Sequence, residues 1–391
     1  MKRVLVYVGY KTINYGSVLQ AFATVKMLKK INADPVLLNL DGLWKKIRVK
    51  KMKFYLSSGD FLFLLQSKGR MYCSKVYEKC NALYGKKISS RRKKFDTFIR
   101  TQLTLTKEVS EFHEISTLLE PYDAVLLGSD QVWLPSSVVT DIYTLHFVED
   151  NHITKAAYAP SFGIDKIPKK YQNKYREMLN DITYVSVREE SGKKIVKEIA
   201  GIDCPVVADP VIMLDKNEWE HYLPYEKKSE KKYIFVYLIG NNRWQREWIK
   251  QYAAACGIKT VALVHLDEHI SYDEKYFDQI LIDESPVDFF NWIRNAELIF
   301  TDSYHCLLFS LLENKEVWCF RRFDDSKKIS TNSRIYNILL KLQIEERLLT
   351  RESTVDSCLF KCIDYTVVNR ELSCLQQESW NFLRMAVNGK L

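Results

Sequence analysis

One segment shows how this chain is built: Ala296-Glu-Leu-Ile-Phe-Thr-Asp-Ser-Tyr-His-Cys-Leu-Leu-Phe-Ser-Leu-Leu-Glu-Asn-Lys315. It opens with a short apolar run that stops at three small polar residues. Apolar residues then recur at about helical spacing up to Asn314. The pattern predicts a strand, a tight turn and a helix, which is the repeating unit of an α/β protein with a parallel sheet.

The turn of this segment is a candidate site. Ser303 can cap the helix, whose free N–H groups and positive dipole end favour an anion. In a parallel sheet this turn lies at the carboxyl edge, where open α/β sheets bind ligands. His305 falls in the first turn, and because imidazole groups change charge near neutral pH, it can exchange a proton with a bound anion. The position suits a packed or water-bonded histidine equally well.

Composition places the chain among ordinary globular proteins. Its 391 residues suffice for two or three domains, with 47% hydrophobic and 27% charged residues. The nine cysteines are scattered, and only Cys358 and Cys362 lie close together, so we expect free thiols in a reducing cytoplasm and no metal site. We expect no secretion signal, and no apolar run is long enough to span a membrane. We therefore expect a cytoplasmic location.

Basic residues are concentrated in the segment 44–100. It contains 17 Lys or Arg and three acidic residues, interleaved with apolar residues such as those at 61–65. Two interpretations stay open. The segment can be an amphipathic insertion that lies on the inner, anionic face of the cell membrane. It can equally be a helical insertion that packs on its own domain and keeps its lysines in water. Nucleic acid is not an expected partner, because no nucleic-acid-binding motif accompanies the charge.

The first part of the chain opens with a strand at 3–8, a helix at 17–30 and a strand at 35–40. Gly9 and Gly16 lie in the intervening loop, but neither a dinucleotide fingerprint nor a Walker A lysine is present. Gly16 lets a ligand approach the backbone. Asn14 can cap the helix or point to a substrate.

Further apolar runs end in polar residues where strands are predicted to stop. These residues are Ser129, Asp130, Gln131, Ser161 and Arg188. Because the carboxyl ends of parallel strands meet at one edge, we expect these side chains to converge. Arginine suits bidentate contact with phosphate or carboxylate, although Arg188 can equally pair with Glu189, Glu190 or Asp209. A helix is predicted at 192–199.

A lysine-rich linker at 226–232 separates two halves of similar pattern. We predict an N-terminal domain at 1–225, which includes the basic insertion at 44–100, and a C-terminal domain at 233–370. A terminal helix within 371–391 can cross back onto the first domain. Arg322 follows the last predicted strand, and Arg334 opens a helix expected at 335–342. Both halves begin strand, loop, helix, strand, so the predicted fold is α/β, with two Rossmann-like domains facing a cleft.

Six motifs in order resemble the polysaccharide pyruvyl transferase family. They are Asn14-Tyr15-Gly16 with Leu19-Gln20-Ala21, Gly128-Ser129-Asp130-Gln131-Val132-Trp133, Tyr158-Ala159 with Ser161-Phe162-Gly163, Ser186-Val187-Arg188-Glu189, Asp209-Pro210, and Thr301-Asp302-Ser303-Tyr304-His305. The resemblance extends over residues 1 to about 345. Tyr304 and Cys306 depart from the phenylalanine and glycine common in the family. The segment 44–100 lies outside the shared motifs.

The resemblance implies a glycosyltransferase-B-like arrangement of the two domains. It also implies transfer of a pyruvyl group from phosphoenolpyruvate to sugar hydroxyls of a cell-surface polysaccharide precursor, as a ketal, without a cofactor. We assign His305 and Arg188 as catalytic, His305 exchanging a proton and Arg188 gripping the donor. Expected donor-binding residues are Ser303, Tyr304, Arg322 and Arg334. Expected on the acceptor side or elsewhere in the cleft are Asn14, Tyr15, Gly16, Ser129, Asp130, Gln131, Ser161 and Asp209.

Two other functions are compatible with the same fold. One is a glycosyltransferase that uses a nucleotide sugar, since fold alone does not determine function. The other is a non-catalytic scaffold that recruits glycan-assembly proteins at the membrane. The partners that we expect are phosphoenolpyruvate and a sugar or lipid-linked oligosaccharide acceptor.

Overall fold

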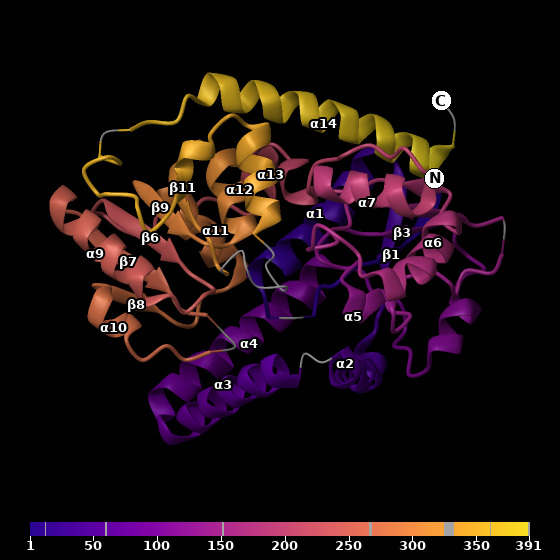
Figure 1. Cartoon of the computed structure of the whole chain (residues 1–391), viewed down its shortest axis with the longest axis horizontal. Helices are drawn as coiled ribbons and strands as arrows, with labels where there is room; N and C mark the ends of the chain where they lie inside the picture. The colour runs from indigo at the N-terminus through magenta and orange to yellow at the C-terminus, as the bar shows by residue number, and fades with distance from the viewer. Residues whose placement is uncertain are drawn as a thin grey trace.

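The computed structural model describes residues 1–11, 13–58, 61–150, 152–265, 268–323, 332–359 and 361–389. Two parallel sheets each form the centre of an α/β domain (Figure 1). The first is five-stranded, in the order β2-β1-β3-β4-β5, and the second is six-stranded, in the order β11-β10-β9-β6-β7-β8. In both, the first strand of the domain lies inside the sheet with later strands on either side. This is the doubly wound order of Rossmann-like domains.

The first sheet is covered by helices on both faces; its central strand β3 is buried along its whole length, and β1 is buried from Val4 onward. Its strands are β1 (Lys2–Tyr7), β2 (Ala33–Leu37), β3 (Ala124–Leu127), β4 (Thr154–Ala157) and β5 (Tyr184–Val185). Its helices are α1 (Tyr15–Lys30), α5 (Pro135–Val138), α6 (Gln172–Asn180), α7 (Glu190–Ala200) and α8 (Lys216–Tyr222).

The second domain repeats this plan around Phe300, Trp318 and Phe320, which are buried in its core. Its strands are β6 (Tyr233–Tyr237), β7 (Lys259–Leu263), β8 (Gln279–Leu281), β9 (Leu298–Thr301), β10 (Glu316–Phe320) and β11 (Leu348–Leu349). Its helices are α9 (Arg243–Cys256), α10 (Asp273–Tyr276), α11 (Pro286–Asn295), α12 (Tyr304–Leu312) and α13 (Ser333–Lys341).

Some element boundaries differ from those predicted. The terminal helix, expected within 371–391, begins at Tyr365. Three further helices also begin earlier than expected, namely α1 at Tyr15, α7 at Glu190 and α13 at Ser333. Their first turns carry polar or small residues, so the apolar periodicity does not mark them. The strand expected at 35–40 runs instead over Ala33–Leu37, because it pairs with β1 from Lys2 to Val6. Its Pro35 is tolerated because β2 lies at the end of the strand order.

The basic segment forms three helices, α2 (Trp44–Ser58), α3 (Phe61–Cys80) and α4 (Ala82–Gln102). Helix α4 is amphipathic, and its buried side chains recur at helical spacing: Tyr84, Ile88, Arg91, Phe95, Phe98 and Ile99. In Figure 1 this layer lies below both sheets, with α3 and α4 extending under the second domain. The insertion therefore packs on the second domain as well as on its own.

The long helix α14 (Tyr365–Asn388) runs along both domains (Figure 1). The hydroxyl of Ser379 accepts a hydrogen bond of 2.7 Å from the backbone N–H of Ala208. The ring of Phe382 lies 6.3 Å, centroid to centroid, from that of Tyr158 in the first domain. The C-terminal helix thus links the second domain back to the first.

Candidate active site

The candidate site lies where the strand order reverses in each sheet. In the first sheet β1 separates β2 from β3, so Gly16 after β1 and Ser129 after β3 adjoin the same crevice. In the second sheet β6 and β9 are neighbours, so Gly240 and His305 adjoin the corresponding crevice. Open α/β sheets bind ligands at such points. The close contacts between His305 and the first domain bring the two crevices together.

Local hydrogen bonds fix the turn that carries His305. The Thr301 hydroxyl donates to the Tyr237 carbonyl (2.7 Å), and the Asp302 carboxylate accepts from the backbone N–H groups of Ile239 and Gly240, both at 2.7 Å. These bonds tie the end of β9 to the end of β6. The Ser303 side chain caps α12 by accepting from Cys306 N–H at 3.5 Å. The polar run before His305 therefore positions the helix rather than presenting its side chains to a ligand.

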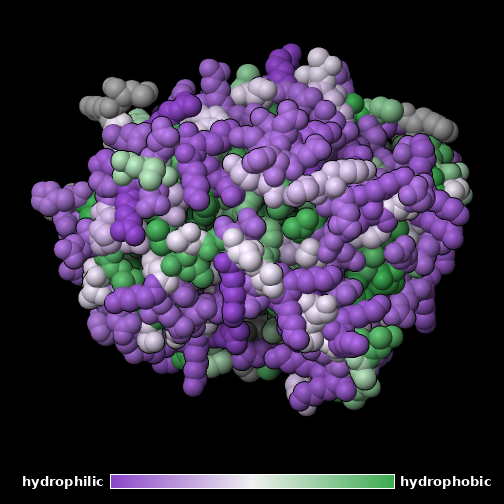
Figure 2. Space-filling model, turned by 180° about the vertical axis from the view of Figure 1, so that it is seen from behind, coloured by the Kyte–Doolittle hydropathy of each residue, from purple (hydrophilic) through white to green (hydrophobic). Residues whose placement is uncertain are grey.

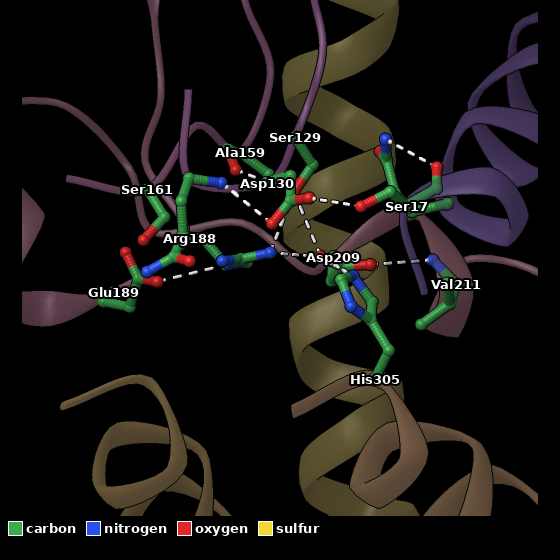
Figure 3. Close-up of polar contacts among 12 residues, drawn as sticks. Ser17, Ser129, Asp130, Ala159, Ser161, Arg188, Glu189, Asp209, Val211 and His305 are labelled. Atoms are coloured by element: carbon green, nitrogen blue, oxygen red, sulfur yellow. Dashed lines mark hydrogen bonds and ion pairs between the residues drawn. The ribbon is translucent and has the colours of Figure 1, made fainter. Parts of the chain in front are cut away.

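His305 faces a buried carboxylate of the other domain, as Figure 3 shows. Its Nε2 lies 3.5 Å from Oδ2 of Asp209 and makes no hydrogen bond to the described residues. The same Oδ2 accepts hydrogen bonds from Nη1 of Arg188 (2.7 Å) and from the hydroxyl of Ser129 (3.0 Å). Oδ2 of Asp209 therefore lies next to both the imidazole of His305, which can exchange a proton, and the guanidinium of Arg188, which stays positively charged.

Asp209 is ionised in this setting. Burial alone would raise the pKa of its carboxyl group, but His305 and Arg188 outweigh burial and hold the pKa of Asp209 well below its usual range. Its Oδ1 accepts a further bond from Val211 N–H at 3.1 Å. A negative charge therefore faces the imidazole at neutral pH.

No side chain fits between His305 and the start of α1. A Cβ atom added at Gly16 would lie 2.2 Å from Nδ1 of His305. Asn14 caps α1, its side chain accepting from Ser17 N–H at 3.2 Å. The glycine therefore lets the imidazole approach the N-terminal turn of a helix in the other domain.

Arg188 is almost completely engaged by acidic partners. Its Nε donates to Glu189 (3.2 Å) and its Nη1 to Asp209 (2.7 Å), while its guanidinium carbon lies 4.5 Å from the centroid of the Tyr304 ring. Burial lowers the pKa of Arg188, but the acidic neighbours, Glu189 first, raise it above its ordinary value. Only Nη2 has no partner among the described residues, so this nitrogen is what Arg188 can offer to a ligand.

Two further arginines bring excess positive charge to the interface. Burial first, and then repulsion from the guanidinium groups of Arg188 and Arg322, lower the pKa of Arg334 to about 10. Arg188, Tyr304, Arg334 and Lys341 line a cavity of about 40 Å³. That volume holds only a few water molecules.

Asp130 lies beside these cations. Its Oδ2 accepts from the Ser17 hydroxyl at 2.8 Å, and His305, Arg188 and Arg334 lower the pKa of its carboxyl group against the effect of burial. Its φ of 84° is in the left-handed region, which aspartate tolerates better than most residues. The turn after β3 thus holds a second carboxylate near His305.

Three other residues predicted on the acceptor side or in the cleft have buried polar groups. Tyr15 is buried between the domains, where its hydroxyl donates to the Glu284 carbonyl (2.9 Å) and its ring stacks on Phe289. The buried Ser161 hydroxyl accepts from Gly163 N–H at 3.1 Å. The side-chain nitrogen of Gln131 is buried without a partner among the described residues, which leaves one donor for a ligand. The buried side chains of Tyr15 and Ser161 therefore support the backbone around the site.

Two residues of the cleft were not identified from the sequence. Arg91 of α4 is fully buried and donates through Nη1 to the Val264 carbonyl (3.0 Å) and through Nε to the Ile282 carbonyl. His265 follows β7, and burial, Arg322 and Arg91 lower its pKa to about 3. One feature of the sequence could have indicated that Arg91 is buried, namely its position in the apolar stripe of α4.

Within the described residues, no group of three or more His, Cys, Asp or Glu side chains is arranged to hold a metal ion. The arrangement instead combines a histidine, two ionised aspartates and three arginines. Such a set can bind an anion and move a proton next to it.

The model of the family described as polysaccharide pyruvyl transferase matches residues 14–324 of the chain. The match includes every motif from the start of α1 to the end of β10. No curated protein matches the sequence significantly.

Solved structures similar to this one have low sequence identity. MnaA of S. aureus, solved with UDP, has 12% identity and a TM-score of 0.52, the match covering 100% of this chain and 98% of that one. The putative UDP-N-acetylglucosamine 2-epimerase of Listeria monocytogenes has 13% identity and a TM-score of 0.51, covering 100% and 92%. These similarities show the fold alone. They confirm the predicted pair of Rossmann-like domains in a glycosyltransferase-B-like arrangement.

Proposed function

Because the chain belongs to the polysaccharide pyruvyl transferase family, we propose that it transfers the pyruvyl group of phosphoenolpyruvate to two hydroxyls of a sugar in a polysaccharide precursor, forming a ketal. The observation that carries the proposal is His305, held between Asp209 and Gly16 next to three buried or half-buried arginines. This combination suits a substrate that is an anion and that gains a proton as it reacts.

The donor would bind to the cationic side of the site. Phosphoenolpyruvate carries a phosphate and a carboxylate, and Arg322, Arg334 and Nη2 of Arg188 are the groups that would face it. Besides burial, the nearby Arg188 and Arg322 lower the pKa of Arg334, so the three guanidinium groups repel one another, which supports this assignment. A bound dianion would relieve that repulsion, and planar guanidinium groups suit both of its charged ends.

The reaction balances without a further reactant. A proton adds to the methylene carbon of phosphoenolpyruvate, which becomes a methyl group and leaves cationic character on the neighbouring carbon. A sugar hydroxyl oxygen bonds to that carbon, the bond from the carbon to the phosphate oxygen breaks, and inorganic phosphate leaves. A second hydroxyl completes the ketal. Of the two hydroxyl protons released, one replaces the proton added to the methylene carbon and the other leaves with phosphate or solvent.

His305 would carry the proton exchange. The ionised Asp209 stabilises an imidazolium at 3.5 Å, so the histidine can take a proton from the attacking hydroxyl or hold one for the donor. Asp130, also ionised, lies on the side of the first domain, where the sugar would bind. Gln131 offers that sugar a buried hydrogen-bond donor.

Two measurements test the proposal. Phosphoenolpyruvate should raise the melting temperature of the protein, since a ligand that binds only the native state stabilises it. Candidate glycans incubated with the protein and phosphoenolpyruvate should gain the mass of a pyruvyl ketal, with phosphate released. A melting temperature that responds to nucleotide sugars and ignores phosphoenolpyruvate would instead favour a glycosyltransferase.

A further inference from the structure

Exposed apolar side chains gather on the insertion. Outside α2, α3 and α4, the described residues with large exposed apolar side chains are only Met1, Tyr225, Leu340 and Met385. On the three helices they are Val49, Leu56, Leu65, Met71, Tyr72, Val76 and Leu83. The lower right of Figure 2, where α3 lies by its place in Figure 1, shows hydrophobic side chains among hydrophilic ones. Such a concentration is unusual on a surface that meets only water.

Helix α3 has an inner and an outer face. Arg70 pairs with Glu268 (3.3 Å), and the Ser74 hydroxyl accepts from His269 N–H (2.7 Å). Tyr77 stacks on the His269 ring at 3.6 Å. Residues 70, 74 and 77 therefore face the second domain, since positions four and seven apart share one side of a helix.

The side of α3 opposite these contacts is both apolar and basic. By the same spacing it carries Leu65, Lys68, Tyr72, Lys75, Val76 and Lys79, all of them exposed. An α-helix with one face packed on protein and the other mixed in this way has a surface suited to a second, external contact.

The neighbouring helices continue this surface. On α2 the side chains of Ile47 and Phe54 are buried, and the exposed ones include Lys45, Arg48, Val49, Lys53 and Leu56. On α4 the exposed side chains include Leu83, Lys86 and Lys93. We call the exposed residues named on α2, α3 and α4, including Met71, the basic-apolar face.

Positive charge on this face is not neutralised. Lys45, Lys53, Lys75, Lys79, Lys86 and Lys93 form no ion pair within the described part of the chain. The acidic residues described on these helices already have partners, because Glu78 pairs with Arg92 and Asp96 with Arg100. The face therefore attracts anions.

We propose that the basic-apolar face docks on an anionic lipid bilayer. Its lysines would bind acidic headgroups, and its leucine, valine and tyrosine side chains would enter the boundary between headgroups and acyl chains. No helix of the described residues is long and apolar enough to cross a membrane, so the contact would be peripheral. A second copy of the chain is a poorer occupant, because it would place like charges opposite each other.

Docking would bring the interdomain site near the membrane. Arg91 on the inner side of α4 binds the backbone just beyond β7 and β8, at the carboxyl edge of the second sheet. The outer side of the same helix belongs to the docking face. An acceptor sugar on a lipid carrier would then reach the site from the bilayer.

The test is sedimentation of the full chain with vesicles, which needs no catalytic turnover and so is independent of the proposed function. We expect the protein to pellet with vesicles of phosphatidylglycerol and phosphatidylcholine, and to stay in solution with phosphatidylcholine alone. Added salt should release it. Lys75→Gln with Lys79→Gln should lower the partition coefficient about 30-fold, since each lysine near such a surface contributes about 1 kcal/mol.

The matched control is Lys194→Gln with Lys197→Gln, two exposed lysines of α7, which should leave vesicle binding unchanged. Tyr72→Ser with Leu83→Ser should weaken binding about tenfold by removing apolar contact. Equal pelleting with neutral and anionic vesicles would overturn the proposal. So would Tyr72→Ser with Leu83→Ser leaving binding intact, because a face that needs only its lysines would be a general polyanion site. A dimer that the same substitutions dissociate, without vesicle binding, would identify a second copy as the occupant.

Discussion

The imidazole of His305 and the backbone of Gly16 belong to different domains and lie so close that a Cβ on the glycine would be 2.2 Å from Nδ1. Gly16→Ala should therefore push His305 away from Asp209. We expect kcat to fall by about 100-fold, since a small misplacement of a catalytic group costs about that much. The unfolding temperature should change little if the domains separate slightly to admit the methyl group.

The control for this substitution is Gly69→Ala. Gly69 also lies within a helix, but no atom lies within 4 Å of the Cβ that it would gain. We expect unchanged turnover there and slightly higher stability, because alanine is the better helix former. Full activity of Gly16→Ala would show that the contact between these residues does not matter for the reaction.

His305 itself should be needed for proton exchange. His305→Ala and His305→Gln should each lower kcat by 10² to 10⁴, the usual contribution of a general acid or base. Binding of phosphoenolpyruvate, followed by its effect on the melting temperature, should persist in both variants because the arginines are intact. A loss of less than about tenfold in kcat would remove His305 from the proposed reaction.

Asp209→Asn tests the charge opposite the imidazole. The folded state holds the pKa of Asp209 well below its unfolded value of about 4. Its carboxylate therefore stabilises the fold fully above pH 4, and this contribution is lost as the pH falls towards the folded pKa. The difference in unfolding free energy between wild type and Asp209→Asn should be large at pH 7 and shrink as the pH falls below 4. Urea unfolding at a series of pH values would measure it, and a difference independent of pH would contradict the assignment.

Arg322 is the most accessible arginine of the site. Its Nη2 donates to the Asp302 carbonyl (2.9 Å), while its Nε has no hydrogen-bond partner among the described residues. Arg322→Gln should raise the KM for phosphoenolpyruvate at least tenfold, because it removes a charge-assisted contact worth about 1.5 to 3 kcal/mol. Arg243→Gln on the exposed start of α9 is the matched control and should leave KM unchanged. Equal KM values in the two variants would place the donor elsewhere.

Local patterns predicted the elements that carry the site, but they did not predict how distant segments meet. The apolar run and serine cap at 298–303 lie next to each other in sequence, and they form β9 and the start of α12 as expected. Arg188 and Asp209 belong to one domain, and the sequence offered their pairing as one alternative. The meeting of His305 with them depends on how two domains face each other, and no local spacing contains that information. The family resemblance brought these residues together in the prediction.

Arg91 is a second residue whose contacts with a distant segment could not be predicted from the sequence. It is one of the 17 basic residues of 44–100, yet none of its side chain is exposed. Its position between Ile88 and Phe95 on the buried stripe of α4 was visible in the sequence. The sequence could not show that the stripe packs against carbonyl groups of the other domain.

Arg91 therefore gives the last prediction. Its guanidinium joins the insertion to the carbonyls of Val264 and Ile282, and it lies 5.9 Å from the ring of Tyr15. In Arg91→Gln the side chain is too short to reach the carbonyls of both Val264 and Ile282. The domains should therefore separate more readily. Small-angle scattering without ligand should show a larger radius of gyration, and the KM for phosphoenolpyruvate should rise while kcat at saturation stays close to that of the wild type. Arg92→Gln, which removes only a surface pair with Glu78, should change neither quantity. An unchanged radius in Arg91→Gln would mean that the other interdomain contacts, such as those of Tyr15, His305 and α14, suffice to hold the two domains in this arrangement.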